Sequence, residues 1–291
     1  MLVSELGEDW LALKREELSA GTLYTYERIM RTSIGPAIGQ RRVRTIEPFE
    51  LQAMLMTALR ERSINEALKT RAVLKGLFGF AEDLGIAPTS PALKIRLPRG
   101  VGISTGGIHE VPSPAEARQM SDALPRRYKL MPVLAAFAGL RWQEVAALKE
   151  GDFDLPRRIL NVERAVGRNE QIKTPKSAAG VRKTVWAAEV HDDIEALVAT
   201  LTPGEFVFLS PQDKLLHYPN WRNRLWVPAC SRAGLSWTFH QFRHTFAVES
   251  LRRGRSVQSV ASMMGHANPR VTWEVYAGLF EDHLDEAKLA W

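Results

Sequence analysis

A segment rich in glycine and proline, residues 97–113, most limits how this chain of 291 residues can fold. It lacks any apolar periodicity, and its composition is typical of a linker. Before it, apolar residues recur at helical spacing throughout. After it, helical patterns alternate with short runs rich in β-branched residues. The sequence therefore predicts two folded parts, residues 1–96 and 114–280, followed by a short acidic tail, residues 281–291.

The part before the linker is predicted to be entirely helical. A first amphipathic stretch begins with Trp10, Leu11 and Leu13, and a second runs past Tyr26. A third helix opens at Pro48, which suits the first turn of a helix. A fourth follows Ser63, a typical N-cap residue whose partner in a capping box would be Glu66, and it stops at a glycine. We expect a four-helix unit that starts within the first ten residues.

The part after the linker is predicted to be mainly helical with a small antiparallel sheet at one edge, an α+β arrangement. The expected helices are Pro114–Leu124, Tyr128–Ala138, which ends at Gly139, and Glu144–Leu148. The expected strands are Ile159–Val162, Ala165–Ile172 and Arg182–Trp186. From residue 188 onward the pattern is helical again. The chain as a whole is therefore expected to be mostly α.

Composition narrows the class of protein. Hydrophobic residues make up 45% and charged residues 25% of the chain, as in ordinary globular proteins. A single cysteine, Cys230, excludes an internal disulfide framework, and no cysteine–histidine spacing suits zinc. The amino terminus lacks the pattern of a signal peptide, and no apolar run reaches the ~18 residues of a membrane span. We therefore expect a cytoplasmic protein without a structural metal.

Charge points toward a polyanionic partner. The net charge is +6 although the tail, residues 281–291, carries four acidic residues against one lysine. The remainder of the chain is thus more basic than the total suggests. A basic body permits binding to nucleic acid, although an ordinary solvated surface would have the same charge.

Five residues dispersed along the second part share one chemistry. Arg141 lies in Gly-Leu-Arg-Trp-Gln-Glu, and His240 and Arg243 lie in His-Gln-Phe-Arg. His266 follows a glycine that we expect to end a helix, and Tyr276 comes ten residues later. Arginine forks and histidines can hold a phosphodiester, and a phenolic oxygen can attack it once its proton is removed. The five residues therefore indicate phosphoryl transfer.

These boxes resemble those of the tyrosine recombinase (phage integrase) family in residue type, order and spacing. The resemblance implies that Arg141 and Arg243 clamp the scissile phosphate and that Tyr276 attacks it. It also implies that His240 and His266 donate hydrogen bonds to the phosphate. The acidic residue three positions after the first arginine, Glu144, would support the site. One departure is that Ala-Gly follows the tyrosine, where the family often has a histidine within two residues.

The general acid that protonates the leaving 5′ oxygen is less clearly marked. In the family it is a lysine on the turn between the second and third strands, and this chain has two candidates there, Lys173 and Lys176. A preceding proline and a following serine favour Lys176, and Lys173 stays the alternative. His244, beside the second arginine, has no role in the resemblance, and we interpret it as a packed or surface group.

The first part resembles the core-DNA-binding domain of these recombinases, a SAM-like helical bundle, in length, helix count and position. Its basic residues are therefore candidate DNA contacts: Arg28, Arg31, Arg41, Arg42, Arg44, Lys69, Arg71 and Lys75. Because the first helix begins so early, we expect the simple two-domain layout without an additional arm-binding domain.

The activity implied is that of a site-specific recombinase. It would cut double-stranded DNA core sites through a 3′-phosphotyrosine, exchange strands through a Holliday junction as a homotetramer, and need neither metal nor ATP. An excision factor is a possible further partner. The tail is expected to dock on a neighbouring subunit, and packing on its own catalytic domain is the alternative. The alternatives are a type IB topoisomerase and a non-catalytic helical DNA-binding regulator.

Overall fold

The computed structural model describes residues 1–98, 110–168, 170–173 and 180–276. The chain divides into two compact units, Met1–Thr105 and Gly106–Trp291. The division lies inside the segment that we expected to be a linker, most of which falls outside the described residues. Each unit has its own buried apolar core.

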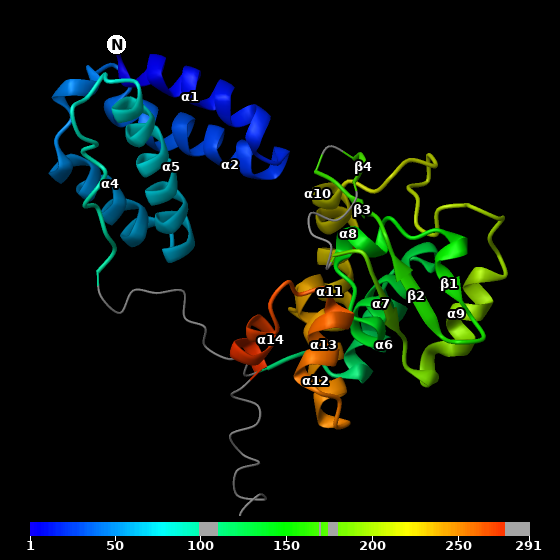
Figure 1. Cartoon of the computed structure of the whole chain (residues 1–291). Coiled ribbons are helices and arrows are strands. Elements are labelled where there is room, and N and C mark those ends of the chain that lie inside the picture. Colours follow the sequence, from blue (N-terminus) through cyan, green and yellow to red (C-terminus); the bar gives the residue numbers. More distant parts are fainter. Residues whose placement is uncertain (99–109, 169, 174–179, 277–291) are drawn as a thin grey trace, which may run out of the picture. The chain divides into compact units, whose positions relative to one another are not determined.

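The amino-terminal unit is built from helices (Figure 1): α1 (Val3–Glu17), α2 (Ala20–Ile29), a π-helical turn (Met30–Ile34), α3 (Gly35–Ile38), α4 (Pro48–Glu61) and α5 (Ile64–Asp83). Trp10 of α1 stacks on Tyr26 of α2 with ring centroids 5.4 Å apart. It also lies against Gly76 of α5, where a Cβ atom would come within 2.5 Å of the indole. Three helices are therefore joined around one tryptophan.

Two local expectations for this unit were only partly right. Ser63 does cap α5, because its hydroxyl accepts a hydrogen bond from the Glu66 amide at 3.1 Å. The carboxylate of Glu66, however, binds Arg28 at 2.7 Å, so the reciprocal half of the capping box is absent among the described contacts. Leu13, expected on the apolar face of α1, is 46% exposed.

The carboxy-terminal unit combines helices with short strands. Its α-helices are α6 (Pro114–Ala123), α7 (Leu130–Ala138), α8 (Trp142–Val145), α9 (His191–Val198), α10 (Tyr218–Trp221), α11 (Val227–Ala233), α12 (Phe239–Arg252), α13 (Val257–Met264) and α14 (Pro269–Tyr276). Its strands are β1 (Phe153–Asp154), β2 (Ile159–Val162), β3 (Ala165–Val166), β4 (Ile172–Lys173) and β5 (Arg182–Val185). In Figure 1, β1 and β2 lie toward one edge of this unit and α14 toward the other.

The strands form two antiparallel sheets. One has the order β1-β2-β5, with Val162 of β2 opposite Arg182 of β5, and the other is the pair β3-β4. The single strand expected over Ala165–Ile172 is wrong. Gly167 and Gln171 close a turn within it, with the Gly167 amide donating to the Gln171 carbonyl at 2.7 Å, so the segment folds into a hairpin. Strand β1 was not expected.

The core of this unit is formed where α12 packs along α7. Aromatic rings fix the first turn of α12, since Phe239 and Phe242 contact the indole of Trp226 edge-on at centroid distances of 5.3 and 5.6 Å. Such pairs add to the burial of their apolar area. Among the described residues, no helix has the length and hydropathy needed to cross a membrane.

Candidate active site

The site begins where Gly139 ends α7 with a left-handed backbone conformation. Its φ is +74, and a Cβ atom there would lie 2.6 Å from the ring of Phe246. Only glycine suits both demands. The chain then reverses so that Arg141 becomes the N-cap of α8, and Glu144 accepts from the Arg141 amide at 2.7 Å. This return contact starts the helix at Trp142, earlier than the expected Glu144–Leu148.

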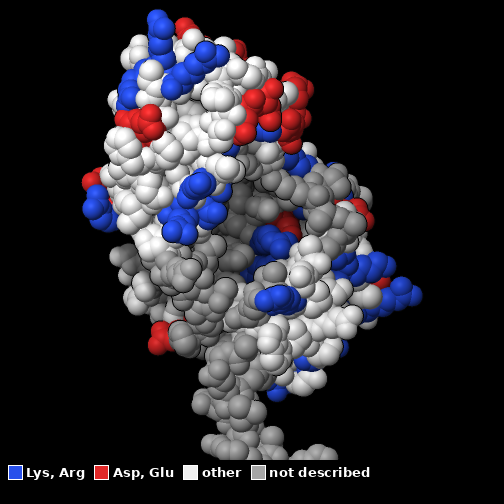
Figure 2. All heavy atoms as spheres, turned by 60° about the vertical axis from the view of Figure 1, so that its left-hand side comes forward, with Lys and Arg blue, Asp and Glu red and all other residues white. Residues whose placement is uncertain are grey.

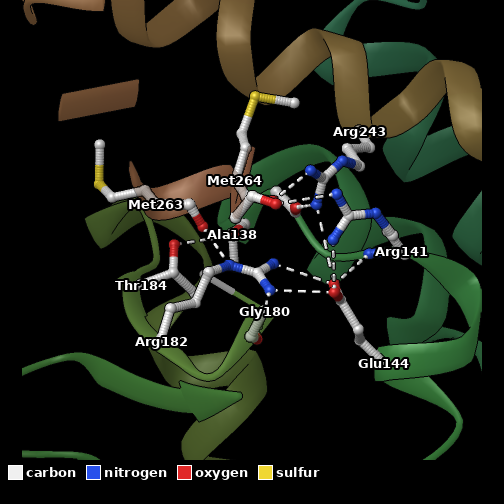
Figure 3. A network of polar contacts seen from close by, with 11 residues as sticks. Ala138, Arg141, Glu144, Gly180, Arg182, Thr184, Arg243, Met263 and Met264 are labelled. Carbon is white, nitrogen blue, oxygen red and sulfur yellow. Dashed lines mark hydrogen bonds and ion pairs between the residues drawn. The ribbon is translucent and has the colours of Figure 1, made fainter. Parts of the chain in front are cut away.

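Glu144 lies at the centre of a buried ionic network (Figure 3), and three arginines point toward it. Arg182 of β5 binds it with two parallel contacts of 2.9 Å, and Arg141 donates to it at 2.8 Å. The third arginine, Arg243 of α12, lies 3.7 Å away. The side chain of Glu144 is 3% exposed. One carboxylate therefore joins residues from α8, β5 and α12.

The network extends to the carbonyl groups at the end of α13. Arg182 Nε donates to the Met263 carbonyl at 2.6 Å, and Arg141 donates to the Gly265 carbonyl at 3.2 Å. Arg243 donates to the Met264 carbonyl and to that of Gly139. These contacts satisfy carbonyls that a helix end leaves without partners. They also fix the position of the backbone just before His266.

The ionisation of these groups follows from burial and from each other. Burial opposes the charge of Glu144, but the hydrogen bonds and charge of Arg182, helped by the other two arginines, lower its pKa to about 2. Burial and the charge of Arg141 lower the pKa of Arg243 to about 9, which leaves it charged at neutral pH. Three guanidinium groups around one carboxylate leave two positive charges uncompensated within the described residues.

The two expected histidines border this network and are neutral at pH 7. Burial, followed by the charges of the arginines Arg243 and Arg141, lowers the pKa of His240, and the same causes lower that of His266 to about 4. His266 follows Gly265, which ends α13 in the left-handed conformation as expected. Its Nδ1 lies 2.6 Å from the hydroxyl of the buried Thr272 on α14.

A cavity of about 510 Å³ opens beside the network. Arg141 and His240 line it together with the aromatic side chains of Trp142, Tyr218 and Phe239. The side chain of Arg141 is 28% exposed, whereas that of Arg243 is 1% exposed. Of the two arginines predicted to clamp a phosphate, Arg141 is thus the one that an entering group can reach directly.

Tyr276 ends α14 and is also buried. Its side chain is 1% exposed, and its hydroxyl lies 2.5 Å from Nδ1 of His244. The ring of His244 in turn contacts that of His240 edge-on at 4.9 Å between centroids. Burial raises the pKa of Tyr276, and the charge of Arg243 opposes that rise only in part.

Comparison with known proteins decides the family. The profile of the phage integrase family matches residues 112–283, and that of the phage integrase central domain matches residues 3–97. The chain belongs to the phage integrase family.

Curated relatives of this integrase-family chain include two tyrosine recombinases. XerA of Thermococcus onnurineus is 27% identical over 60% of this chain and 59% of its own length. XerC of Oceanobacillus iheyensis is 25% identical over 80% of this chain and 77% of its own length. The chain thus spans less than two thirds of the first relative.

Solved structures show the same fold. The Tn1549 transposon integrase in complex with transposon right end DNA superposes with a TM-score of 0.82 at 19% identity and covers 100% of both chains. A lambda integrase tetramer bound to a Holliday junction gives 0.72 at 18% identity and covers 92% of this chain and 78% of that one. The mostly helical fold with a small antiparallel sheet, expected from the sequence, is confirmed.

The structure places most of the predicted site residues near one another in this integrase-family unit. Arg141, Glu144 and Arg243 share one network, and the pKa values of His240, His266 and Tyr276 respond to its charges. Lys176 lies outside the described residues. Lys173 is the last residue of β4 and pairs with Ala165.

Two polar residues of this region were not assigned a role from sequence. Arg182 was expected only as the first residue of a strand, yet it pairs with Glu144 through two contacts of 2.9 Å. The sequence feature that could have marked Arg182 is a charged residue at the start of a strand whose later residues include the buried Thr184. His244 was interpreted as a packed or surface group, although it lies one helical turn after His240 and therefore on the same face.

The candidate DNA contacts of the amino-terminal unit fall into two groups. Arg28 and Arg41 form ion pairs with glutamates, and Arg44 donates to the Ile86 carbonyl at 2.6 Å. For the others we find no ion pair within the described residues: Arg31, Arg42, Lys69, Arg71 and Lys75. Figure 2 shows basic side chains in several groups on one face, with acidic side chains between some of them.

Proposed function

We propose that this chain is a site-specific DNA recombinase that cuts and rejoins double-stranded DNA through Tyr276. Arg141 and Arg243 neutralise the phosphate, and His240 and His266 donate hydrogen bonds to it. Glu144 and Arg182 hold Arg141 and Arg243 in place. The substrate is a short core site, and the chemistry needs neither metal nor ATP.

The observation that carries this proposal is the excess positive charge around Glu144. Uncompensated buried charge is costly, and it persists where a ligand of opposite charge completes the group. A phosphodiester carries one negative charge and gains another as its phosphorus becomes pentacoordinate. A cavity lined by Arg141 and His240 gives such a group a way in. Arginine forks fit two phosphate oxygens and stay ionised.

The reaction would proceed in two balanced steps. The phenolic oxygen of Tyr276 forms a bond to phosphorus while the bond from phosphorus to the 5′ oxygen breaks. The phenolic proton leaves to a nearby base, and the 5′ oxygen receives a proton from a lysine. The 5′ hydroxyl of the partner duplex then attacks the phosphotyrosine and restores both the DNA linkage and the tyrosine.

Assembly follows the same reasoning. A lambda integrase forms a tetramer on a Holliday junction, and this chain shares its fold. We propose a homotetramer that exchanges strands in pairs and acts on DNA in the cytoplasm, with an excision factor as a further partner. Residues 281–291, outside the described residues, would dock on the neighbouring subunit.

The deciding experiment is covalent trapping on a nicked suicide substrate. Wild-type protein should give a protein–DNA adduct that survives denaturing electrophoresis, in excess EDTA as well as without it. Tyr276→Phe should give no adduct while binding the site normally, because only the nucleophilic oxygen is lost. An adduct in Tyr276→Phe, or cleavage that strictly requires Mg²⁺, would refute the proposal.

The general acid is tested separately. If Lys176 protonates the leaving oxygen, Lys176→Ala should cleave an ordinary substrate at least about 100-fold more slowly, the usual range for general acids. It should recover on a substrate with sulfur at the 5′ bridging position, since a thiolate leaves without a proton. Rescue of Lys173→Ala alone would transfer the role to Lys173.

A further inference from the structure

The place of Tyr276 in the structure does not suit attack on DNA. Its side chain lies in an apolar cluster with Phe246, Val260 and Met264, and only 1% of its surface is exposed. It does not line the cavity that Arg141 and His240 share. Its burial also raises the pKa of the phenol, which makes it a poorer nucleophile. The hydroxyl must therefore move before it can meet a phosphate.

One polar contact holds the hydroxyl where it is. The Tyr276 oxygen lies 2.5 Å from Nδ1 of His244, and the two rings meet at a centroid distance of 5.7 Å. The phenol donates this bond when the ring of His244 carries its proton on Nε2, since Nδ1 then accepts. A buried hydroxyl without a partner would be unfavourable, so the contact offsets the cost of burial.

The surroundings of His244 keep it in the accepting form. Burial disfavours the charged ring, and the neighbouring groups His240 and Arg243 on α12 and His266 at the end of α13 act in the same direction. Tyr276 of α14 supplies the donor. An imidazolium at this place would lose the ability to accept at Nδ1. The geometry and the charges of the site thus both favour a neutral acceptor.

We propose that His244 is a positioning residue that holds Tyr276 in a resting place in the DNA-free protein. Engagement of a phosphate by the arginine network would then accompany release of the hydroxyl from His244. This inference rests on the proposed function of Tyr276 as the nucleophile. The family resemblance assigned His244 no role, and the contact itself is the reason for giving it one.

The test uses two substitutions at one position. His244→Phe keeps a flat ring against His240 and Tyr276 but lacks the acceptor. His244→Asn places a carbonyl oxygen near the position of Nδ1 and can keep the bond. Without DNA, each full-length variant is treated with a reagent that nitrates accessible tyrosines, and labelling of each tyrosine is followed by mass spectrometry.

The protein contains its own reference residues. Tyr24 and Tyr218 are 42% and 41% exposed and should react equally in all variants. Tyr128 is 4% exposed in the core of the same unit and should stay protected. If Tyr128 reacts in His244→Phe, the substitution has loosened the core, and His244→Leu takes its place.

We expect Tyr276 to be labelled about 3- to 10-fold faster in His244→Phe than in wild type, the factor that loss of one hydrogen bond provides. His244→Asn should stay close to wild type. Single-turnover adduct formation on the suicide substrate should be as fast in His244→Phe as in wild type, or faster. Unchanged labelling of Tyr276, or adduct formation slowed at least about tenfold as for a lost general base, overturns the proposal.

Failure of the proposed function would look different. It would leave wild-type protein without a Tyr276 adduct, whereas the labelling experiment needs no DNA and reports on the resting place alone.

Discussion

Each unit of this protein contains a glutamate shared by more than one arginine, and the two clusters differ in burial. Glu66 of α5 pairs with Arg28 and Arg62, whose side chains are 29% and 42% exposed. Glu144 pairs with Arg182, which is 5% exposed, and with Arg243, which is 1% exposed. The same residue types thus form a partly exposed cluster in one unit, where Glu66 is 13% exposed, and a more deeply buried network in the other, where Glu144 is 3% exposed.

The difference in burial shows which of the two ion-pair clusters indicates a functional site. Water reaches Arg28 and Arg62 and screens the Glu66 cluster in part, so its contribution to stability is the smaller one. The Glu144 network is withdrawn from water, so each ion depends on its neighbours, and its surplus of positive charge calls for an anion. Counting ion pairs in the sequence would not separate the two clusters. Burial does.

The largest expected effect comes from removing the carboxylate in each cluster. Glu144→Gln should destabilise the carboxy-terminal unit by about 3–5 kcal/mol, because it leaves buried arginines without their counter-charge. Glu66→Gln should cost about 0–1 kcal/mol in the amino-terminal unit. Urea denaturation with peptide-resolved hydrogen exchange reports on each unit separately. Equal losses in both variants would erase the distinction between the clusters.

Much of this arrangement could be predicted from sequence because it depends on local signals. Pro48 at a first helical turn, Ser63 at an N-cap, and Gly139 and Gly265 at left-handed helix ends all acted as expected. Strand β2 has the predicted bounds, Ile159–Val162. Each of these features is decided within a few residues of chain.

The remainder depends on contacts between distant segments. Arg182 meets Glu144 across 38 residues, and no pattern near either one indicates the pairing. His244 became informative only when α14 placed the hydroxyl of Tyr276 against it. The hairpin of β3 and β4 interrupts a run that is otherwise typical of one strand. Tertiary packing thus decided which polar residues of the site work together.

Acid should affect the two units differently. All seven histidines follow residue 105, so the unit Met1–Thr105 contains none. In the other unit His244 has a pKa of about 3, lowered by burial and by the charge of His240, and His266 has one of about 4. Both values lie below the ordinary 6.5, so the unfolded chain binds protons first. Stability is then complete above pH 6.5 and is lost as pH falls toward the folded values.

Between pH 7 and pH 5 the carboxy-terminal unit should therefore lose about 3–4 kcal/mol, with the amino-terminal unit nearly unaffected. Glu144, with a pKa of about 2, adds its own loss only below pH 4.5. The same denaturation assay at both pH values measures this difference. His244→Asn should lose less than wild type, since it has one fewer proton to bind on unfolding. A parallel decline of both units would point to a cause other than the buried histidines.

The smallest effect concerns DNA binding by the amino-terminal unit. Arg71 of α5 forms no ion pair within the described residues, so its charge is available for a phosphate, whereas that of Arg28 is balanced by Glu66. If Arg71 meets a phosphate, Arg71→Ala should reduce the slope of log affinity against log salt concentration by about 0.9. Removing the surface pair, Arg28→Gln together with Glu66→Gln, keeps the net charge and should leave the slope unchanged.

A full salt titration by fluorescence anisotropy resolves the two cases. If the double variant loses slope and Arg71→Ala does not, then ion pairing within the protein does not decide which cations reach DNA.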